Sequence, residues 1–322
     1  MTEPTDRHDR EVMLQDVLEG LALPQKELSP KYFYDTRGSE LFEEITRTEE
    51  YYPTRTERGL LEAWMPRWVG AYQPAALVEL GAGSARKSRV VLDAMRSHGT
   101  GNLYVPVDVS GEFLHETAAR LREEYEHLEV RPEVADITAP LDLPEDLPMP
   151  TWFALLGSTI GNFDDTHAAR LLCRVARHLR PGDSFLMGVD LRPGPGKSVA
   201  RLEAAYNDAA GITAAFNLNV LTVLNRELGA DFDVGAFRHH AFYNPDEGRM
   251  EMHLVAESDQ HVRLPAAEQI LIPEAESIRT EISCKYDRAT VDRIFHEAGM
   301  VVHAWAEDAE GFFALVLGTP AP

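Results

Sequence analysis

Cysteine is rare in this sequence, and no histidine pattern typical of a metal centre occurs. Only two of the 322 residues are cysteine, Cys173 and Cys284, and two isolated thiols provide neither a disulfide framework nor the paired spacing of a zinc site. The twelve histidines include the neighbours His239 and His240, but the sequence has no HxxH or HExxH motif. We therefore expect a protein without a bound metal.

Positive charge is scarce as well. Lysine and arginine together number 31, against 53 aspartate and glutamate residues, which gives a net charge of −22. Binding of nucleic acid needs clustered cations that displace counterions. The balance therefore argues against a nucleic-acid partner and favours a small-molecule substrate. We expect the protein to act as a monomer.

Long apolar runs are missing too. The sequence has no stretch of eighteen apolar residues, which is the length that predicts a membrane-spanning helix. Residues 1–10 are polar and charged, so they lack the apolar centre of a signal peptide and predict a disordered tail. The expected location is the cytoplasm, with no membrane partner.

The stretch that organises the rest of the chain is an apolar run followed by a glycine-rich turn. Residues 77–80 read Leu-Val-Glu-Leu, and Gly81 and Gly83 follow. This pattern predicts a buried parallel strand that enters a tight loop, where glycine lets the backbone approach a nucleoside closely. The third glycine of the dinucleotide-binding pattern is replaced by Arg86, so a nicotinamide cofactor is the weaker interpretation.

Three further predicted strands also end in an acid or a glycine. Residues 103–108 end at Asp108, residues 128–134 precede Asp136, and residues 152–156 precede Gly157. In a parallel sheet these ends form the rim of one ligand crevice, and an acid at the second strand binds a ribose diol. The alternative is that Asp108 and Asp136 only cap the helices that follow them.

The alternation of strands and helices divides the chain. Residues 57–196 alternate in the way that predicts right-handed βαβ crossovers, and a Pro- and Gly-rich linker follows at 192–198. Residues 231–261 alternate as antiparallel strands do, and the chain closes with a predicted hairpin. We expect an α/β fold with a Rossmann-like sheet, formed by residues 57–196 and 286–322. Residues 11–56 and 197–285 would form an α+β domain inserted into it.

Two stretches outside the glycine turn remain open to two interpretations. The aromatic residues at 32–34 and 51–52 suit either a lid over a ligand or a small hydrophobic core. The loop after the fourth strand places Asn162 beside Gly161. There it would offer an acceptor and two donors to a ligand, or serve as a left-handed turn residue.

Nine motifs, taken together, closely resemble one family. They are YFYD at 32–35, GSELF at 38–42, EYYPTR at 50–55, LVELG at 77–81, LGSTIGN at 156–162, FNLNVL at 216–221, RELGADF at 226–232, RMEM at 249–252 and TEISCK at 280–285. Their order and content resemble the histidine-specific Nα-methyltransferases of the ergothioneine pathway, from about residue 21 to the C-terminus. The resemblance implies a class I methyltransferase sheet with an inserted substrate-binding domain. It also implies S-adenosylmethionine as the methyl donor and hercynine, the betaine of histidine, as the product.

The resemblance also implies which residues form the site. S-adenosylmethionine would be bound by Gly81, Gly83, Lys87, Asp108, Asp136 and Ile137. The substrate would be bound by Tyr34, Phe42, Tyr51, Gly157, Asn162, Tyr206, Met252, Glu281 and Ser283. Of these, Asn162 and Tyr206 would hold the substrate carboxylate and Tyr34 would lie near the amine, so these three would take part in catalysis. Tyr51, Glu281 and Ser283 would contact the imidazole and Met252 would pack on it, with Glu281 and Ser283 on one side of a strand.

The chemistry of methyl transfer agrees with this set of residues. Attack on a sulfonium methyl group is an in-line displacement, so the site has chiefly to position the amine and remove its water. An α-amine with a pKa of about 8 must lose a proton before each attack, and a phenol such as Tyr34 or a water molecule would accept it. Aromatic faces favour the quaternary ammonium product by about 0.5–2 kcal/mol.

Three alternatives remain at this stage. The enzyme could act on another aromatic amino acid or an indole compound, although Glu281 argues against an apolar pocket. The chain could bind S-adenosylmethionine without catalysis. A nicotinamide oxidoreductase is the alternative that the sequence supports least, because of Arg86.

Overall fold

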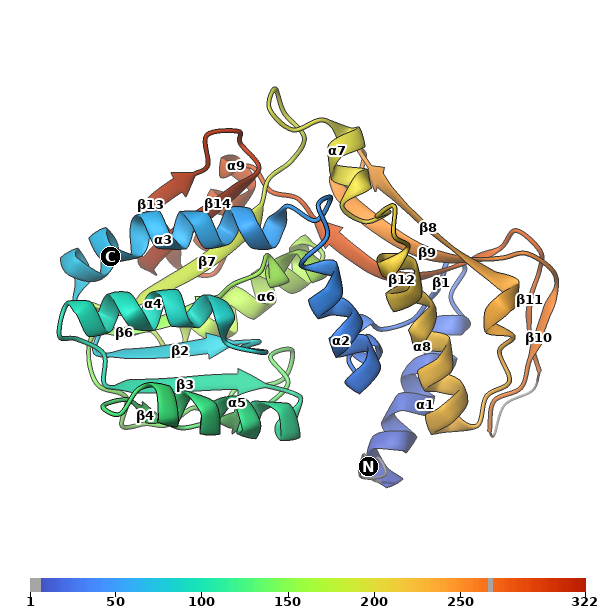
Figure 1. The fold of residues 1–322 in the computed structure, drawn as a ribbon, viewed down its shortest axis with the longest axis horizontal. Coiled ribbons are helices and arrows are strands. Elements are labelled where there is room, and N and C mark those ends of the chain that lie inside the picture. Colours follow the sequence, from blue (N-terminus) through green and yellow to red (C-terminus); the bar gives the residue numbers. More distant parts are fainter. Residues whose placement is uncertain (1–6, 266–268) are drawn as a thin grey trace. The chain divides into compact units, whose positions relative to one another are not determined.

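The computed structural model describes residues 7–265 and 269–322. The chain divides into two compact units, each made of two segments. Unit 1 comprises Met1–Tyr52 and Ser198–Ser283, and unit 2 comprises Pro53–Lys197 and Cys284–Pro322. The boundaries expected from the sequence, after residues 56, 196 and 285, lie within four residues of these divisions. Figure 1 shows the elements of each unit.

Unit 2 is built on one mainly parallel sheet, in the order β13-β14-β7-β6-β2-β3-β4, with β5 also paired to β3. Its strands are β2 (Ala76–Leu80), β3 (Leu103–Asp108), β4 (Glu129–Val130), β5 (Glu133–Val134), β6 (Thr151–Leu155), β7 (Ser184–Asp190), β13 (Met300–Glu307) and β14 (Phe313–Pro320). The final hairpin, β13 and β14, is antiparallel and pairs with β7, which confirms the prediction. The single strand expected over 128–134 is two short strands separated by Pro132, which has no backbone N–H to donate.

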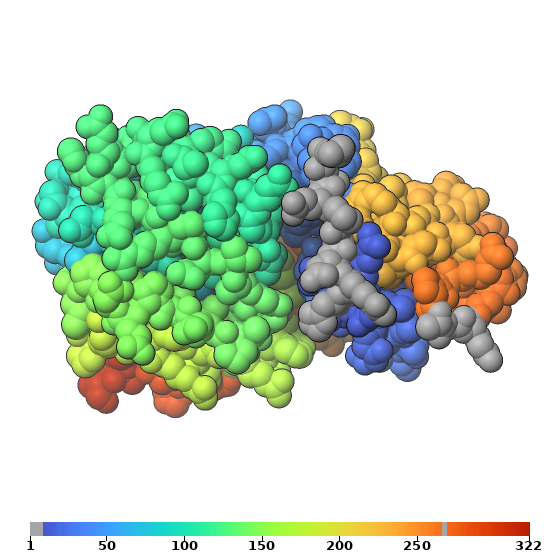
Figure 2. Space-filling view, turned by 90° about the horizontal axis from the view of Figure 1, so that it is seen from below, coloured from blue at the N-terminus to red at the C-terminus, as the bar shows by residue number. Residues whose placement is uncertain are grey.

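Helices cover both faces of this sheet. They are α3 (Pro53–Tyr72), α4 (Arg86–Ser97), α5 (Gly111–Glu124), α6 (Asp165–Ala176) and α9 (Arg288–Glu297). Figure 1 shows α3, α4 and α5 on the near face, and α6 packs against α9 on the far face. In the view from below, green atoms from the part of the chain around α5 form this side of unit 2 (Figure 2). The sequence did not predict α3, because it continues through Pro66, a residue that normally interrupts a helix.

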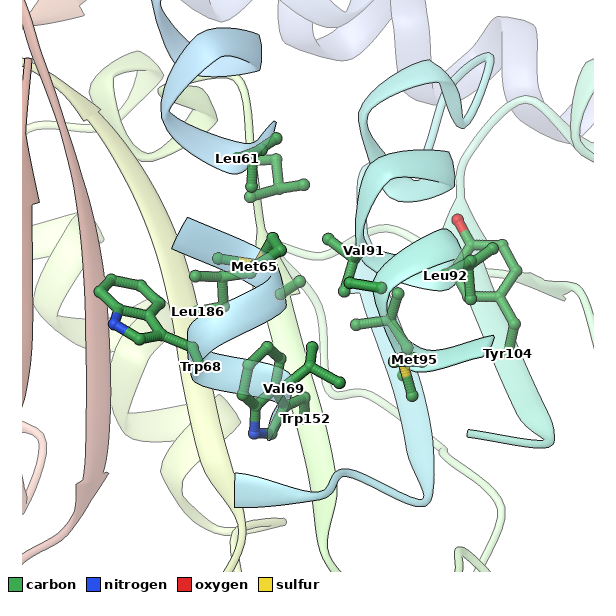
Figure 3. Packing of buried hydrophobic residues seen from close by; sticks show 14 of the residues in the cluster. Leu61, Met65, Trp68, Val69, Val91, Leu92, Met95, Tyr104, Trp152 and Leu186 are labelled. Carbon is green, nitrogen blue, oxygen red and sulfur yellow. The ribbon is translucent and has the colours of Figure 1, made fainter. Parts of the chain in front are cut away.

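The core of unit 2 explains why α3 forms. Leu61, Met65 and Val69 follow the four-residue spacing of one helix face and are fully buried. Figure 3 shows this face pointing toward Val91 of α4 and Trp152 of β6. Burial of such side chains contributes roughly 1.5–3 kcal/mol each. The three together therefore exceed the cost of about 3 kcal/mol for one proline inside this twenty-residue helix.

Unit 1 has a four-stranded sheet in the order β1-β12-β9-β8 and a separate two-stranded antiparallel sheet, β10-β11. The strands are β1 (Lys26–Glu27), β8 (Phe237–Asn244), β9 (Arg249–Ala256), β10 (Gln260–Val262), β11 (Ile270–Ile272) and β12 (Ser277–Cys284). The α-helices are α1 (Arg7–Leu21), α2 (Thr36–Ile45), α7 (Val199–Ala204) and α8 (Ile212–Leu228), and the short 3-10 helices are η1 (Pro30–Phe33) and η3 (Val234–Ala236). The apolar helix α8 packs on β8 and β9.

Two details near the N-terminus differ from expectation. Helix α1 begins at Arg7, so residues 7–10 are helical where a disordered tail was predicted, while residues 1–6 lie outside the described residues. The N-cap of α2 is Asp35, whose carboxylate accepts a hydrogen bond from the Gly38 N–H at 2.8 Å. The sequence alone also allows Ser39 as a cap, but Ser39 lies inside the helix. A charged oxygen at the N-cap is favoured by the free N–H groups of the first turn.

Candidate active site

The glycine turn after β2 is open and lies against the tip of β3. Gly81 and Gly83 have positive φ angles of 71° and 50°, which glycine adopts without strain. The Gly83 N–H donates to Oδ2 of Asp108 at 3.0 Å. Among the described residues, no heavy atom lies within 4 Å of the position that a Cβ on Gly83 would occupy. A ligand can therefore approach the backbone here.

The two predicted acids at the strand tips behave differently. Oδ1 of Asp108 accepts from the Ser110 N–H at 3.0 Å, and Ser110, not Asp108, occupies the N-cap position of α5. Asp136 uses Oδ1 to accept from both the backbone N–H and the hydroxyl of Thr138, at 2.7 and 2.6 Å. The described residues between β5 and β6 contain no helix, so the bonds of Asp136 to Thr138 close a turn, and the capping alternative describes neither acid. The Ala135 N–H donates to the Asp108 carbonyl at 3.1 Å, which holds the two tips together.

A buried carboxylate that the sequence did not reveal joins two predicted site residues. Glu57 of α3 is fully buried. Its Oε2 lies 2.6 Å from Nζ of Lys87, and its Oε1 accepts from the Gly157 N–H at 2.7 Å. A Cβ on Gly157 would lie 2.7 Å from the Lys87 ammonium, and the φ of 81° at this position also favours glycine. The sequence feature that could have revealed this buried carboxylate is the position of Glu57 four residues before Leu61, which places it on the apolar face of α3.

Asn162 ends the 3-10 helix η2 (Thr159–Asn162), which follows β6. The residues of this loop with a positive φ are Gly157, at 81°, and Ser158, at 57°, so the interpretation of Asn162 as the left-handed turn residue is wrong. The loop is held from two sides. The Asp190 N–H donates to the Ser158 hydroxyl at 2.9 Å, and the Tyr286 hydroxyl donates to the Ile160 carbonyl at 3.0 Å.

Two groups of charged or polar side chains are buried behind these strand tips. Glu79 of β2 accepts hydrogen bonds from the hydroxyls of Ser88 and Tyr104. Burial raises the pKa of Glu79 to about 7, against the effect of those bonds and of the Lys87 charge.

The second group is an ion cluster in which Asp190 lies between two buried lysines. Lys197 is 2.5 Å and Lys285 is 2.8 Å from the Asp190 carboxylate. Burial opposes ionisation of Asp190, but the two ammonium groups outweigh it and lower its pKa. Burial also lowers the pKa of Lys197 to about 8, in part offset by Asp190. The Pro- and Gly-rich linker predicted at 192–198 therefore contains one firmly buried residue.

Five of the predicted substrate residues form one continuous row in unit 1. The ring of Tyr34 lies 5.9 Å from that of Phe42, Phe42 lies 6.3 Å from Tyr51, and Tyr51 lies 6.3 Å from Tyr206. Each pair is edge-to-face, which is a favourable arrangement for aromatic rings. The Tyr206 hydroxyl donates to Oγ of Ser283 at 2.9 Å. The row of aromatic rings therefore ends on a polar residue of β12.

Glu281 and Met252 lie on neighbouring strands of the same sheet. Glu281 is on β12, two residues before Ser283, and is half-buried. Met252 of β9 is buried, and its carbonyl accepts from the Thr280 hydroxyl at 3.1 Å. The structure therefore gathers seven of the nine predicted substrate residues in unit 1. Gly157 and Asn162 belong to unit 2, together with all of the residues predicted to bind the methyl donor.

Two negative findings apply to the part of the chain that the structure describes. Within residues 7–265 and 269–322, no group of three or more His, Cys, Asp and Glu side chains is placed to hold a metal ion. None of the helices described there is long and apolar enough to cross a membrane.

Comparison with known proteins identifies the family. The family model described as "Histidine-specific methyltransferase, SAM-dependent" matches residues 13–320. The chain belongs to this family. A relative from Mycobacterium tuberculosis, named histidine N-alpha-methyltransferase, is 43% identical over 306 residues, which cover 94% of this chain and 93% of that protein. Ergothioneine biosynthesis protein 1 from Neurospora crassa is 31% identical over 85% of this chain and 31% of that protein.

The fold agrees with that assignment. The crystal structure of an S-adenosylmethionine-dependent methyltransferase from Clostridium acetobutylicum matches with a TM-score of 0.51 and 11% identity, covering 87% of this chain and 98% of that one. The prediction of a Rossmann-like methyltransferase sheet is confirmed. This chain is therefore an S-adenosylmethionine-dependent methyltransferase that acts on a small molecule, and the oxidoreductase alternative is wrong.

Proposed function

We propose that this enzyme transfers three methyl groups in succession from S-adenosylmethionine to the α-amino nitrogen of L-histidine and so forms hercynine, the first step of ergothioneine biosynthesis. The observation that carries the proposal is the similarity to the histidine N-alpha-methyltransferase over almost the whole of both chains. The similarity to an ergothioneine biosynthesis protein supports the pathway.

The strand tips of unit 2 suit the methyl donor. Asp108 would accept hydrogen bonds from a ribose diol, since each of its oxygens has used only one backbone N–H. Gly81 and Gly83 leave room for a ligand at the turn, and the adenine would lie beside Asp136 and Ile137. Lys87 supplies a positive charge at the same edge of the sheet. When bound, the donor supplies an electrophilic methyl group, and these residues hold and orient it.

The substrate side combines polar and aromatic groups. Asn162 and Tyr206 would hold the histidine carboxylate, and Glu281 and Ser283 would bond the two imidazole nitrogens. Tyr51 and Phe42 would line the pocket with Gly157, and Met252 would pack on the ring. Because Tyr206 and Ser283 are already bonded to each other, the groups for both ends of the amino acid have a fixed spacing before it binds.

The amine must lose a proton before each attack, since its reference pKa is about 8. Tyr34 is 41% exposed, so either its hydroxyl or a water molecule beside it would accept that proton. The aromatic rings of Tyr34 and Phe42 would favour the cationic product. The chain would carry out this reaction as a cytoplasmic monomer without a metal, and light scattering of the purified protein tests the oligomeric state.

The direct test is incubation of the purified protein with histidine and isotope-labelled S-adenosylmethionine, followed by mass spectrometry. Products one, two and three methyl groups heavier than histidine are expected. Binding of the donor with no methylated product would contradict the proposal. Competition with tryptophan and tyrosine separates a histidine enzyme from one that acts on another aromatic amino acid.

The role of Glu281 can be measured separately by calorimetry. Glu281→Ala is expected to weaken histidine binding by about ten- to 150-fold, which corresponds to the loss of a charged hydrogen bond of about 1.5–3 kcal/mol. Glu281→Gln keeps the shape and one acceptor oxygen, so it serves as the matched control and should lose less. Equal affinity of Glu281→Ala and the wild type would remove Glu281 from the site.

A further inference from the structure

The backbone of Tyr206 is held by a histidine that the sequence did not single out. Nε2 of His239, on β8, lies 2.9 Å from the Tyr206 carbonyl oxygen. A carbonyl only accepts, so Nε2 must carry the hydrogen. The other ring nitrogen, Nδ1, is then an acceptor, and it lies 2.9 Å from Nδ2 of Asn217. Both ring nitrogens of His239 therefore have a defined role.

The amide of Asn217 is fixed in turn. Asn217 is fully buried on α8, and its Nδ2 also donates to the His253 carbonyl at 3.1 Å. Its Oδ1 accepts from the Thr280 hydroxyl at 2.6 Å. A rotated amide would place its oxygen against the His253 carbonyl, which can only accept, so only one orientation satisfies this partner.

These bonds form a closed circuit. From Thr280 on β12 it passes through Asn217 and His239 to the carbonyl of Tyr206, and from the Tyr206 hydroxyl back to Ser283 on β12. Glu281 lies between Thr280 and Ser283 on the same strand. Tyr206 is thus held at both ends, and the strand segment with the polar substrate residues is held at two points.

We propose that Asn217 and His239 are positioning residues that set the distance between Tyr206 and the 281–283 segment, and thereby the affinity for the amino-acid substrate. The proposal rests on the function proposed above, because it takes Tyr206 and Ser283 as substrate-binding residues. It assigns to the FNLNVL motif a role beyond helix packing. A buried polar network with every member paired specifies one arrangement, and loss of one member leaves other buried groups unpaired.

The test compares two substitutions at His239 by steady-state kinetics. His239→Leu removes both hydrogen bonds and is expected to raise KM for histidine about tenfold, with kcat changed less than threefold and KM for S-adenosylmethionine unchanged. His239→Gln offers one donor and one acceptor, so it should restore KM for histidine to within about threefold of the wild type. A protein that is only less stable would not show this split or this rescue.

The control variant is His240→Leu, at an exposed neighbouring position on β8, which should leave all kinetic constants unchanged. If His239→Leu does not fold, Thr280→Val provides the test, because it removes the hydroxyl that bonds Asn217 and keeps the shape of the side chain. It should raise KM for histidine about threefold. An unchanged KM for histidine in whichever of these variants folds would overturn the proposal.

Tyr206→Phe separates failure of this proposal from failure of the proposed function. If the wild type methylates histidine and Tyr206→Phe raises KM while His239→Leu does not, the network has no positioning role. If the wild type does not methylate histidine, the proposed function itself is wrong.

Discussion

The predicted donor site in unit 2 and the predicted substrate site in unit 1 are built from different kinds of groups. In unit 2, the predicted donor site lies at the ends of neighbouring strands, where the glycine turn adjoins the Asp108 carboxylate that two backbone N–H groups orient. In unit 1, the predicted substrate site consists of side chains from segments as far apart as Tyr34, Tyr206 and Ser283. The methyl donor would thus be bound by features that follow from the geometry of the sheet. The choice of amino acid would instead depend on individual side chains, each of which can be substituted singly.

Burial shifts the pKa of Glu79 in unit 2 and of two histidines in unit 1 in opposite directions. Behind the glycine turn, burial raises the pKa of Glu79 to about 7. In the substrate unit, burial lowers the pKa of His239 and of His253. A buried acid prefers its protonated form and a buried histidine its unprotonated form, and both are neutral. Glu79 should therefore lower the stability of the fold as pH rises, whereas the two histidines should lower it as pH falls.

The largest effect is expected for Glu79→Gln. Between pH 4.5 and 7 the folded protein holds a proton on Glu79 that the unfolded chain releases, so the free energy of unfolding of the wild type falls as pH rises through this window. The variant cannot titrate there. Relative to the wild type, its free energy of unfolding should rise by up to about 3 kcal/mol between pH 4.5 and 8. Urea unfolding at several pH values measures this, and parallel curves for the two proteins would contradict it.

The second effect concerns the open glycine turn. Gly83→Ala places a methyl group where we expect the donor, and S-adenosylmethionine binding should weaken about a hundredfold while histidine binding is kept. Gly99→Ala is the matched control, because Gly99 has a similar positive φ of 67° and equally open surroundings among the described residues. Both variants should lose about 1–2 kcal/mol of stability from backbone strain. Calorimetry that finds the same donor affinity in both would mean that Gly83 does not face the donor.

The smallest effect is expected for Glu57→Gln. The glutamine keeps an acceptor for the Gly157 N–H but loses the charge that orients Lys87. We expect donor affinity to fall about tenfold, with KM for histidine within twofold of the wild type. Glu62→Gln, on the exposed side of the same helix, is the control. A change in KM for histidine with unchanged donor affinity would contradict the assignment of donor binding to unit 2 and of substrate binding to unit 1.

The parts of the fold that follow from local patterns were predictable. The apolar runs of β2 and β3, each ending in a glycine or an acid, marked the donor side, because all parallel strands of such a sheet end at one edge. Asp287, which stands between a strand pattern and a helix pattern, predicts a helix cap, and its carboxylate accepts from the Thr290 N–H at 2.7 Å. These features depend on neighbours within a few residues.

The remainder depends on contacts between distant residues. Glu57 meets Gly157 a hundred positions further along the chain, and Asn217 meets Thr280 across 63. Neither pairing leaves a local pattern in a single sequence. The substrate residues themselves came from the resemblance to the family, since spacing alone showed only that Glu281 and Ser283 lie on one strand.

The buried cluster of Asp190 with Lys197 and Lys285 has a consequence for engineering. One lysine stands just before the segment 198–283 leaves the sheet, and the other stands just after it returns. Both ends of the segment 198–283 are therefore anchored by an ion pair to the Asp190 carboxylate. A chimera that grafts the specificity segment of one relative onto another must keep both lysines with their aspartate, because loss of Asp190 would leave two ammonium groups stranded in an apolar interior.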